Sequence, residues 1–193
     1  MSIDTQLFTS QNLYLTAVDA EACAPIFARW TEDLDFAEGF SNLPPTSLRV
    51  DEMKKRLEEM IKQAAHEGTS YFFAVHLKAD DAVIGYVHIK WILWNNGTGQ
   101  LKLDLPEGNV LNEHGLEALR LALQFIFDEL NLSRVAMVFS ENRQDLRALA
   151  EAAGMQLEVR QRERFFRHGR YWDGLMYGIL GDEWLGTTLE VRP

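Results

Sequence analysis

GQLKLDLPEGNVLNEHGLEALRLALQFIFDELNLSRVAMVFSEN, residues 99–142, is the stretch that decides the fold. Apolar residues recur at helical spacing in its middle and predict an amphipathic helix over residues 115–130; they are Leu116, Leu119, Leu123, Ile126 and Phe127. The next run, Val135–Phe139, is wholly apolar and of strand length, which predicts a central strand buried on both faces. A strand, a loop, a long helix and a second strand therefore follow one another without a linker.

The loop between Leu105 and Gly115 leads into the start of the predicted helix. A helix N-terminus offers unpaired backbone N–H groups and the positive end of the helix dipole, and both favour a bound anion. We therefore expect an anion site at this loop. Glu113 and Asn112 also have a structural interpretation there, because an acidic residue in the first turn favours the dipole and asparagine is a common N-cap.

Composition limits the class of protein. A chain of 193 residues with 47% hydrophobic residues can bury a sizeable core and has the length of one domain. The formal net charge of −10 argues against a protein that grips nucleic-acid phosphates and favours a cationic or amine-bearing partner, although acidity also serves solubility alone. We expect no nucleic-acid partner.

Cysteine and histidine usage limits the chemistry. Cys23 is the only cysteine, so an internal disulfide and a multi-cysteine zinc site are excluded, and a reducing compartment is indicated. The five histidines are scattered without metal-ligand spacing, and we predict no metal site. Because the chain shows neither a signal-peptide pattern nor an apolar run of about 18 residues, we expect a soluble cytoplasmic protein without a membrane partner.

Outside this stretch the pattern predicts the other elements of an α/β (α+β) fold. Strands are expected at residues 11–18, 71–78, 82–94 and 100–105 and as a closing hairpin within 155–180, whose turn lies near His168-Gly169. Helices are expected after an Asp19 cap, from Thr46 or Ser47 to Gly68, and after an Asn142 cap to Gly154. Residues 32–47, EDLDFAEGFSNLPPTS, have no period and are predicted to be a loop, a common carrier of function.

Several phrases along the chain are typical of one family. They are LYLTAV, DLDFAEGF, VIGYVHI, HGLEALRLALQFIFDELNLSRVAMVFSEN and HGRYWDGLMYGILGDEW. With the order of elements, they resemble the GNAT superfamily of N-acetyltransferases, in particular the RimJ/RimL-like branch of ribosomal-protein N-terminal acetyltransferases. The resemblance implies one acyltransferase domain over residues 1–193, with a mixed, mostly antiparallel sheet of about seven strands, about four flanking helices, and strands four and five splayed apart.

The resemblance also implies a place for acetyl-CoA, between strands four and five, here QLKLDL and RVAMVFS. Backbone at the end of strand four would pair with the pantetheine arm, and N–H groups at the start of the next helix would hold the pyrophosphate. The implied cofactor-binding residues are Asp104, Leu105, Val110, Leu111, Asn112, Glu113, His114, Gly115, Leu116 and Asn142.

Two positions depart from the family pattern of Arg or Gln, two residues, Gly, one residue, and Gly or Ala. Gly115 matches the last glycine, whereas Glu113 replaces the first glycine and Val110 replaces the Arg or Gln. Glycine lets a backbone approach a phosphate closely, and a carboxylate repels it. In addition, Ala150 stands where many relatives carry a tyrosine that acts as general acid.

Direct attack of an amine on a thioester needs a neutral amine, an oxyanion donor and a path for the proton. Asp35 and Glu38, in the loop that lines the acceptor side in relatives, could hold a cationic amine or relay its proton; plain solvation is the alternative. Ser140, at the end of strand five, could donate to the thiolate sulfur, or simply end the strand. Trp91, Trp94, Trp172, Phe165 and Phe166 either wall an acceptor pocket or, as we favour for most, pack in the fold.

These observations favour an N-acetyltransferase that moves an acetyl group from acetyl-CoA to a primary amine, on a protein N-terminus or a small polyamine-like molecule. The alternative is a degenerate GNAT domain, without acetyl-CoA turnover, that acts as a binding or regulatory module; the altered loop supports it. A different acyl group is a third alternative. The oligomeric state stays open between a monomer and a homodimer, which is common among relatives.

Overall fold

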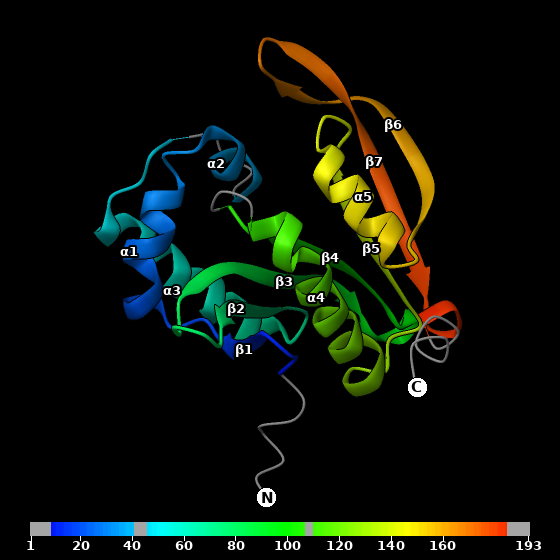
Figure 1. Cartoon of the computed structure of the whole chain (residues 1–193), viewed down its shortest axis with the longest axis horizontal. Helices are drawn as coiled ribbons and strands as arrows, with labels where there is room; N and C mark the ends of the chain where they lie inside the picture. The colour runs from blue at the N-terminus through cyan, green and yellow to red at the C-terminus, as the bar shows by residue number, and fades with distance from the viewer. Residues whose placement is uncertain (1–8, 41–45, 107–109, 185–193) are drawn as a thin grey trace, which may run out of the picture. The chain divides into compact units, whose positions relative to one another are not determined.

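The computed structural model describes residues 9–40, 46–106 and 110–184 (Figure 1). Its strands are β1 (Leu13–Ala17), β2 (Tyr71–Leu77), β3 (Val83–Leu93), β4 (Thr98–Asp104), β5 (Arg134–Ser140), β6 (Gln156–Arg167) and β7 (Arg170–Leu180). Its α-helices are α1 (Ala20–Trp30), α2 (Leu34–Phe40), α3 (Val50–Glu67), α4 (Val110–Gln124) and α5 (Gln144–Ala152). A 3-10 turn (Trp94–Asn96) follows β3, and a π-helical turn (Phe125–Glu129) continues α4.

The strands form one mixed sheet in the order β1-β2-β3-β4-β5-β7-β6. β1 pairs antiparallel with β2, β5 with β7, and β7 with β6, whereas β4 and β5 are parallel. The parallel ladder ends at Gln100↔Ala136, although β4 continues to Asp104 and β5 to Ser140. The expected α/β fold is confirmed, and the short ladder agrees with strands four and five parting beyond it.

The described residues pack as two compact units. The first unit takes the chain up to His88 together with Leu103–Leu111, and the second takes Ile89–Lys102 and the chain from Asn112 onward. β3 and β4 contribute residues to both units.

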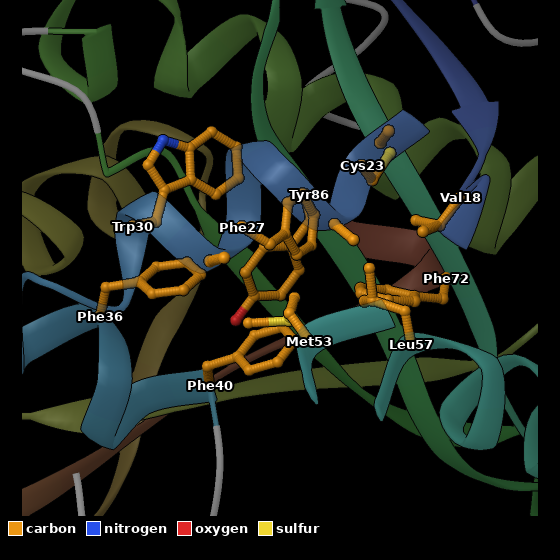
Figure 2. Packing of buried hydrophobic residues seen from close by; sticks show 13 residues of the cluster. Val18, Cys23, Phe27, Trp30, Phe36, Phe40, Met53, Leu57, Phe72 and Tyr86 are labelled. Atoms are coloured by element: carbon orange, nitrogen blue, oxygen red, sulfur yellow. The ribbon is translucent and has the colours of Figure 1, made fainter. Parts of the chain in front are cut away.

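The first unit is built around Phe27 of α1, which is completely buried. Its ring contacts five others at centroid distances between 4.8 and 6.4 Å, those of Trp30, Phe36, Phe40, Phe72 and Tyr86. Figure 2 shows this aromatic cluster, with Met53 and Leu57 of α3 beside it. Edge-to-face pairs add about 0.5–1.5 kcal/mol each to the burial term. α1 begins as predicted, because Asp19 Oδ1 accepts the backbone N–H of Ala22 at 2.9 Å.

The loop predicted over residues 32–47 is wrong where α2 forms. Asp33 Oδ1 accepts the backbone N–H groups of Asp35 at 2.8 Å and Phe36 at 3.4 Å, which starts the helix. Phe36 and Phe40, four residues apart, then lie on one face and stack at 5.4 Å. A helix of seven residues is too short for a periodic pattern to show, so tertiary burial of two rings decides its conformation.

The start predicted for the next helix, at Thr46 or Ser47, is also wrong, since α3 begins at Val50. The backbone N–H of Leu48 donates to Thr31 Oγ1 at 2.9 Å. This hydrogen bond keeps Leu48 and the two residues before it outside the helix. Glu52 Oε2 accepts the backbone N–H of Arg49 at 2.9 Å and so reaches back over the helix start. The predicted end is confirmed, because Gly68 adopts φ 62°.

The second unit carries the predicted central strand. β5 is almost entirely buried, with 0% exposure at Val135 and 2% at Ala136, as expected for a strand covered on both faces. Tyr177 of β7 stacks on Phe139 of β5 with ring centroids 5.5 Å apart. The closing hairpin is confirmed as well, with His168 at φ 51° and Gly169 at φ 75° in its turn.

β6 is the outermost strand on its side of the sheet order, and it is exposed along most of its length. Its register against β7 shifts twice, between Leu157 and Val159 and between Gln161 and Phe165. Glu163 lies within the second shift and adopts φ 53°, a left-handed conformation that costs a non-glycine residue energy. None of the described helices has both the length and the apolar character required to cross a bilayer.

Candidate functional site

The predicted site residues fall in both units. The first unit holds Asp35, Glu38, Asp104, Leu105, Val110 and Leu111, and the second holds Asn112, Glu113, His114, Gly115, Leu116, Ser140 and Asn142.

The predicted loop from Leu105 to Gly115 is shorter than expected, because α4 begins at Val110. Glu113 lies in the first turn of α4, where an acidic side chain interacts favourably with the helix dipole, as predicted. Asn112 is not the N-cap, since it is the third residue of the helix. Gly115 is buried inside the helix, so the predicted start at this glycine is wrong, and the helix begins before the apolar repeat from which it was predicted. Residues 107–109 lie outside the described residues.

The end of β4 is packed closely against β3 within the first unit. Asp104 is 5% exposed and Leu105 3% exposed. A Cβ atom on Gly85 of β3 would lie 2.2 Å from the Asp104 carbonyl oxygen and 2.3 Å from Leu105 Cδ2. Only a residue without a Cβ atom at position 85 lets the backbone at the end of β4 approach β3 this closely.

The turn from β5 into α5 holds two polar side-chain atoms that are buried and make no hydrogen bond, Ser140 Oγ and Asn142 Oδ1. We call residues 140–142 the β5–α5 corner. Ser140 is 2% exposed. Leaving such groups without a partner costs roughly 1–3 kcal/mol each, so their retention calls for an explanation beyond stability.

The prediction that Asn142 caps the following helix is wrong. α5 begins at Gln144, its N-cap position is Arg143, and no side-chain hydrogen bond caps it. The backbone oxygen of Asn142 accepts the N–H of Gln144 at 3.0 Å, while the side-chain oxygen stays unpaired. Arg143 instead binds the Asp145 carboxylate in the first turn, at 2.8 Å. The Asn142 side-chain oxygen therefore makes no helix-capping hydrogen bond.

A third buried and unpaired atom in the second unit is His114 Nδ1, in α4. His114 was predicted as one of the cofactor-binding residues, on grounds of resemblance alone. Three of the predicted residues of this unit, His114, Ser140 and Asn142, therefore carry a polar atom that nothing in the described part of the chain satisfies. Such atoms suit a ligand that brings its own donors and acceptors.

The acidic candidates of the first unit lie on α2. Asp35 is partly buried in its first turn, and Glu38 is on the same helix one turn later. The helix, rather than the predicted loop, therefore fixes their backbone. No cluster of three or more His, Cys, Asp or Glu side chains that could bind a metal occurs among residues 9–40, 46–106 and 110–184.

The packing role favoured for the aromatic residues is wrong for three of them. Trp91 is 57% exposed, Trp94 47% and Phe166 59%. Trp91 lies at φ 53° with the Lys90 ammonium 4.4 Å from its ring centroid. The Phe166 ring packs against the exposed ring of Tyr171 across the hairpin, with centroids 5.0 Å apart.

Comparison with known proteins bears directly on this arrangement. Residues 12–156, most of the chain, match the family described as the acetyltransferase (GNAT) domain. The chain belongs to the GNAT acetyltransferase family. An acetyltransferase enzyme, as predicted, is thereby confirmed.

Individual relatives of this GNAT protein agree. The uncharacterised N-acetyltransferase p20 of Bacillus licheniformis is 29% identical over 129 residues, covering 66% of this chain and 72% of that protein. The solved structure of spermidine N-acetyltransferase from Vibrio cholerae in complex with CoA and spermine has a TM-score of 0.78 at 21% identity, covering 91% of this chain and 99% of that one. A Vibrio cholerae protein provisionally named a ribosomal-protein-serine acetyltransferase has a TM-score of 0.72 at 19% identity, covering 93% of this chain and 99% of that one. At these identities the solved structures show the fold alone.

Sequence reasoning missed the residues that support the β5–α5 corner of this GNAT fold. The backbone N–H of Glu141 donates to the carbonyl oxygen of Asp173, on β7, at 2.9 Å. Arg160 of β6 binds the carboxylates of both Glu141 and Asp173. An acidic residue between an aromatic run and a glycine, in YWDG, was the available signal, but its partners are 13 and 32 positions away along the chain.

Proposed function

We propose that the protein is an acetyl-CoA-dependent N-acetyltransferase that acetylates a primary amine by direct attack, without a covalent enzyme intermediate. The observation that carries the proposal is the pair of buried, unpaired atoms at the β5–α5 corner, Ser140 Oγ and Asn142 Oδ1. When bound, acetyl-CoA supplies the acetyl group as an activated thioester. Family membership supports this choice of donor.

The residues of the chain then have distinct tasks. Asn142 Oδ1 is an acceptor suited to an amide N–H of the donor's pantetheine arm, and Ser140 Oγ–H is a donor suited to the sulfur atom as negative charge develops there. The family resemblance supports a role for the backbone at Asp104 and Leu105 in pairing with a pantetheine arm as an added strand would. Residues 110–116, at the start of α4, would contribute N–H groups toward the pyrophosphate.

Acceptor recognition is assigned to the acidic helix α2. A protonated amine binds a carboxylate and must lose a proton before it can attack, so Asp35 and Glu38 are proposed to attract it and to relay that proton. A polyamine-like molecule and a protein N-terminus both present such an amine. The spermine in the Vibrio cholerae complex supports the first, and the RimJ/RimL resemblance supports the second.

The binding experiment is isothermal titration of the purified chain with acetyl-CoA and with CoA. We expect saturable binding of both, weakened about tenfold in Asn142→Ala, which removes one hydrogen bond worth about 1.4 kcal/mol. Arg147→Ala, on the α5 surface, serves as the matched control and should bind as the natural chain does. The absence of binding up to millimolar concentration would overturn the proposal and favour the non-catalytic module, which family membership otherwise disfavours.

The acceptor experiment compares steady-state kinetics with spermidine and with short peptides that carry a free N-terminus. Asp35→Asn and Glu38→Gln should raise the KM of the preferred amine and leave that of acetyl-CoA unchanged, whereas Glu32→Gln, which precedes α2, should change neither. Equal effects on both KM values would exclude α2 from acceptor binding.

We further propose that residues 1–193 form a single acyltransferase domain that acts in the cytoplasm, with a homodimer as the candidate assembly. A single cooperative unfolding transition would support one domain, and two separate transitions would contradict it. Analytical ultracentrifugation distinguishes the dimer from a monomer.

A further inference from the structure

Two polar atoms at the β5–α5 corner have no partner of their own, so their positions follow from the backbone that carries them. Three hydrogen bonds fix that backbone from within the turn: Arg143 N–H to Ser140 O at 2.9 Å, Gln144 N–H to Asn142 O at 3.0 Å, and Gln144 Nε2 to Glu141 O at 2.6 Å. These local bonds shape the turn. They do not attach it to the sheet.

The attachment comes from β7. Ser140 pairs with Gly174 in the antiparallel ladder, and the next residue on each strand, Glu141 and Asp173, continues the contact beyond the end of β5. Glu141 N–H donates to Asp173 O at 2.9 Å, and Asp173 N–H lies 3.5 Å from Glu141 Oε1. Asp173 therefore faces the middle residue of the corner.

The side chain of Asp173 makes two further bonds, both toward β6. Its Oδ2 accepts Arg160 Nε–H at 2.5 Å, and its Oδ1 accepts the backbone N–H of Glu163 at 3.0 Å. Arg160 also binds the Glu141 carboxylate through its Nη2. The Asp173 carboxylate thus joins the outer strand to the bulge at Glu163, and it reaches the corner through Arg160, which also binds Glu141.

The bulge explains why an aspartate suits position 173. Glu163 adopts φ 53° and lies within the register shift between Gln161 and Phe165, where the regular ladder is interrupted. An oxygen from Asp173 satisfies the backbone N–H of Glu163. The hydrogen bond from Arg160, and then that from Glu163, hold the pKa of Asp173 below its usual range, so the side chain is charged at neutral pH.

We infer that Asp173, together with Arg160, is a positioning residue for the β5–α5 corner: the Asp173 carboxylate fixes Arg160, Arg160 binds the Glu141 carboxylate, and Ser140 and Asn142 are thereby placed to receive the acyl donor. The inference rests on the proposed function. Asp173 itself touches neither unpaired atom in any contact found among the described residues, so its effect on binding is indirect.

The first test uses the protein without any ligand. Asp173→Asn keeps the size of the side chain but cannot supply two anionic acceptor oxygens. Amide hydrogen exchange should accelerate about tenfold or more over residues 139–145 and 160–164, the loss expected for a hydrogen bond to a charged group. Glu158→Gln, which alters another arginine-bound carboxylate of the same unit, should leave residues 139–145 unchanged. Unchanged exchange at residues 139–145 in Asp173→Asn would overturn the inference.

The second test measures acetyl-CoA affinity by titration. Asp173→Asn should weaken acetyl-CoA binding about tenfold. The same substitution added to Asn142→Ala should weaken binding much less, because the Asn142 side chain that the corner positions is already absent. Equal losses in the two backgrounds would contradict positioning. If Asp173→Asn does not fold, Arg160→Gln, which leaves the carboxylate in place, decides by the same two measurements. Failure of the natural chain to bind acetyl-CoA would refute the proposed function, whereas the exchange test decides the positioning separately.

Discussion

The Tyr177 hydroxyl donates a hydrogen bond of 2.8 Å to Glu151 Oε1 and so fastens β7 to α5. Tyr177 is 2% exposed, with its ring stacked on Phe139, while Glu151 reaches it from the helix surface and also binds Arg147. Burial first, and then this hydrogen bond, raise the pKa of Tyr177, so the phenol stays protonated and can donate throughout the physiological range.

Tyr177→Phe should lower the free energy of unfolding by about 1–2 kcal/mol, because the ring contacts remain and one hydrogen bond to a charged group is lost. Urea denaturation followed by circular dichroism measures the change. Phe139→Leu is the complementary variant, which removes the stacking and keeps the hydrogen bond. If Tyr177→Phe leaves the free energy of unfolding unchanged while Phe139→Leu lowers it, the hydrogen bond adds nothing to stability.

The acid dependence of stability should involve Glu151. Hydrogen bonds from Arg147, and then from Tyr177, lower the pKa of Glu151 in the folded chain. A carboxyl with a lowered folded pKa stabilises the fold above its ordinary pKa, and that contribution disappears as pH falls through the folded value. Glu151→Gln should therefore be less stable than the natural chain at neutral pH and approach it below about pH 4. A difference that does not change with pH would contradict this linkage.

Ser140→Ala should separate stability from activity. Removing a buried hydroxyl that has no partner relieves a desolvation cost, so the variant should be as stable as the natural chain or up to about 1 kcal/mol more stable. Its kcat should nevertheless fall by about tenfold to a hundredfold if the hydroxyl assists departure of the thiolate. Thermal unfolding and steady-state kinetics on the same samples make the comparison. A less stable but fully active variant would assign Ser140 to the fold instead.

Gly85→Ala should disturb the end of β4. The added methyl group would meet the Asp104 carbonyl oxygen at 2.2 Å, so the two strands must separate. Displacement of this backbone should weaken acetyl-CoA binding by about tenfold to a hundredfold, with a stability loss of about 1–3 kcal/mol. Gly181→Ala is the matched control, because the atom nearest to its Cβ is 3.6 Å away. Undiminished binding by Gly85→Ala would remove Asp104 and Leu105 from the donor site.

Cys23 reports on the core of the first unit. It is 3% exposed, and burial raises the pKa of its thiol. The thiolate is the reactive form, so native protein should react very slowly with an aromatic disulfide reagent and denatured protein at once. Phe27→Leu, which loosens the ring cluster next to it, should speed the native reaction. Rapid labelling of the natural chain would contradict the packing around α1.

Long periodic segments could be predicted from the sequence, whereas short segments and their limits could not. The apolar run of β5 and the amphipathic stripe of α4 repeat often enough for their burial to be unambiguous. α2 has only two buried rings, and its conformation depends on Phe27, which comes earlier in the chain. The starts of α3, α4 and α5 were each misplaced. That of α3 is set by Leu48 and Glu52, through contacts that have no periodic signature.

The candidate site was predictable in part for a similar reason. Ser140 and Asn142 could be named because they directly follow a recognisable strand, and α2 could be named only as a loop with two acids. The support from Asp173 and Arg160 could not be predicted, since it joins β6, β7 and the residue that follows β5, and it depends on a bulge. Resemblance supplied the other donor-site residues, and their part in binding remains a prediction.

The irregular course of β6 also protects the protein in solution. A strand of 12 residues at the end of a sheet exposes a row of backbone groups on which another chain could build. Two register shifts bend β6, and arginines at positions 162 and 164 add positive charge along it. A variant that straightened the strand and neutralised these arginines would gain a flat template for edge-to-edge pairing, so the bulge held by Asp173 also acts as a guard against aggregation.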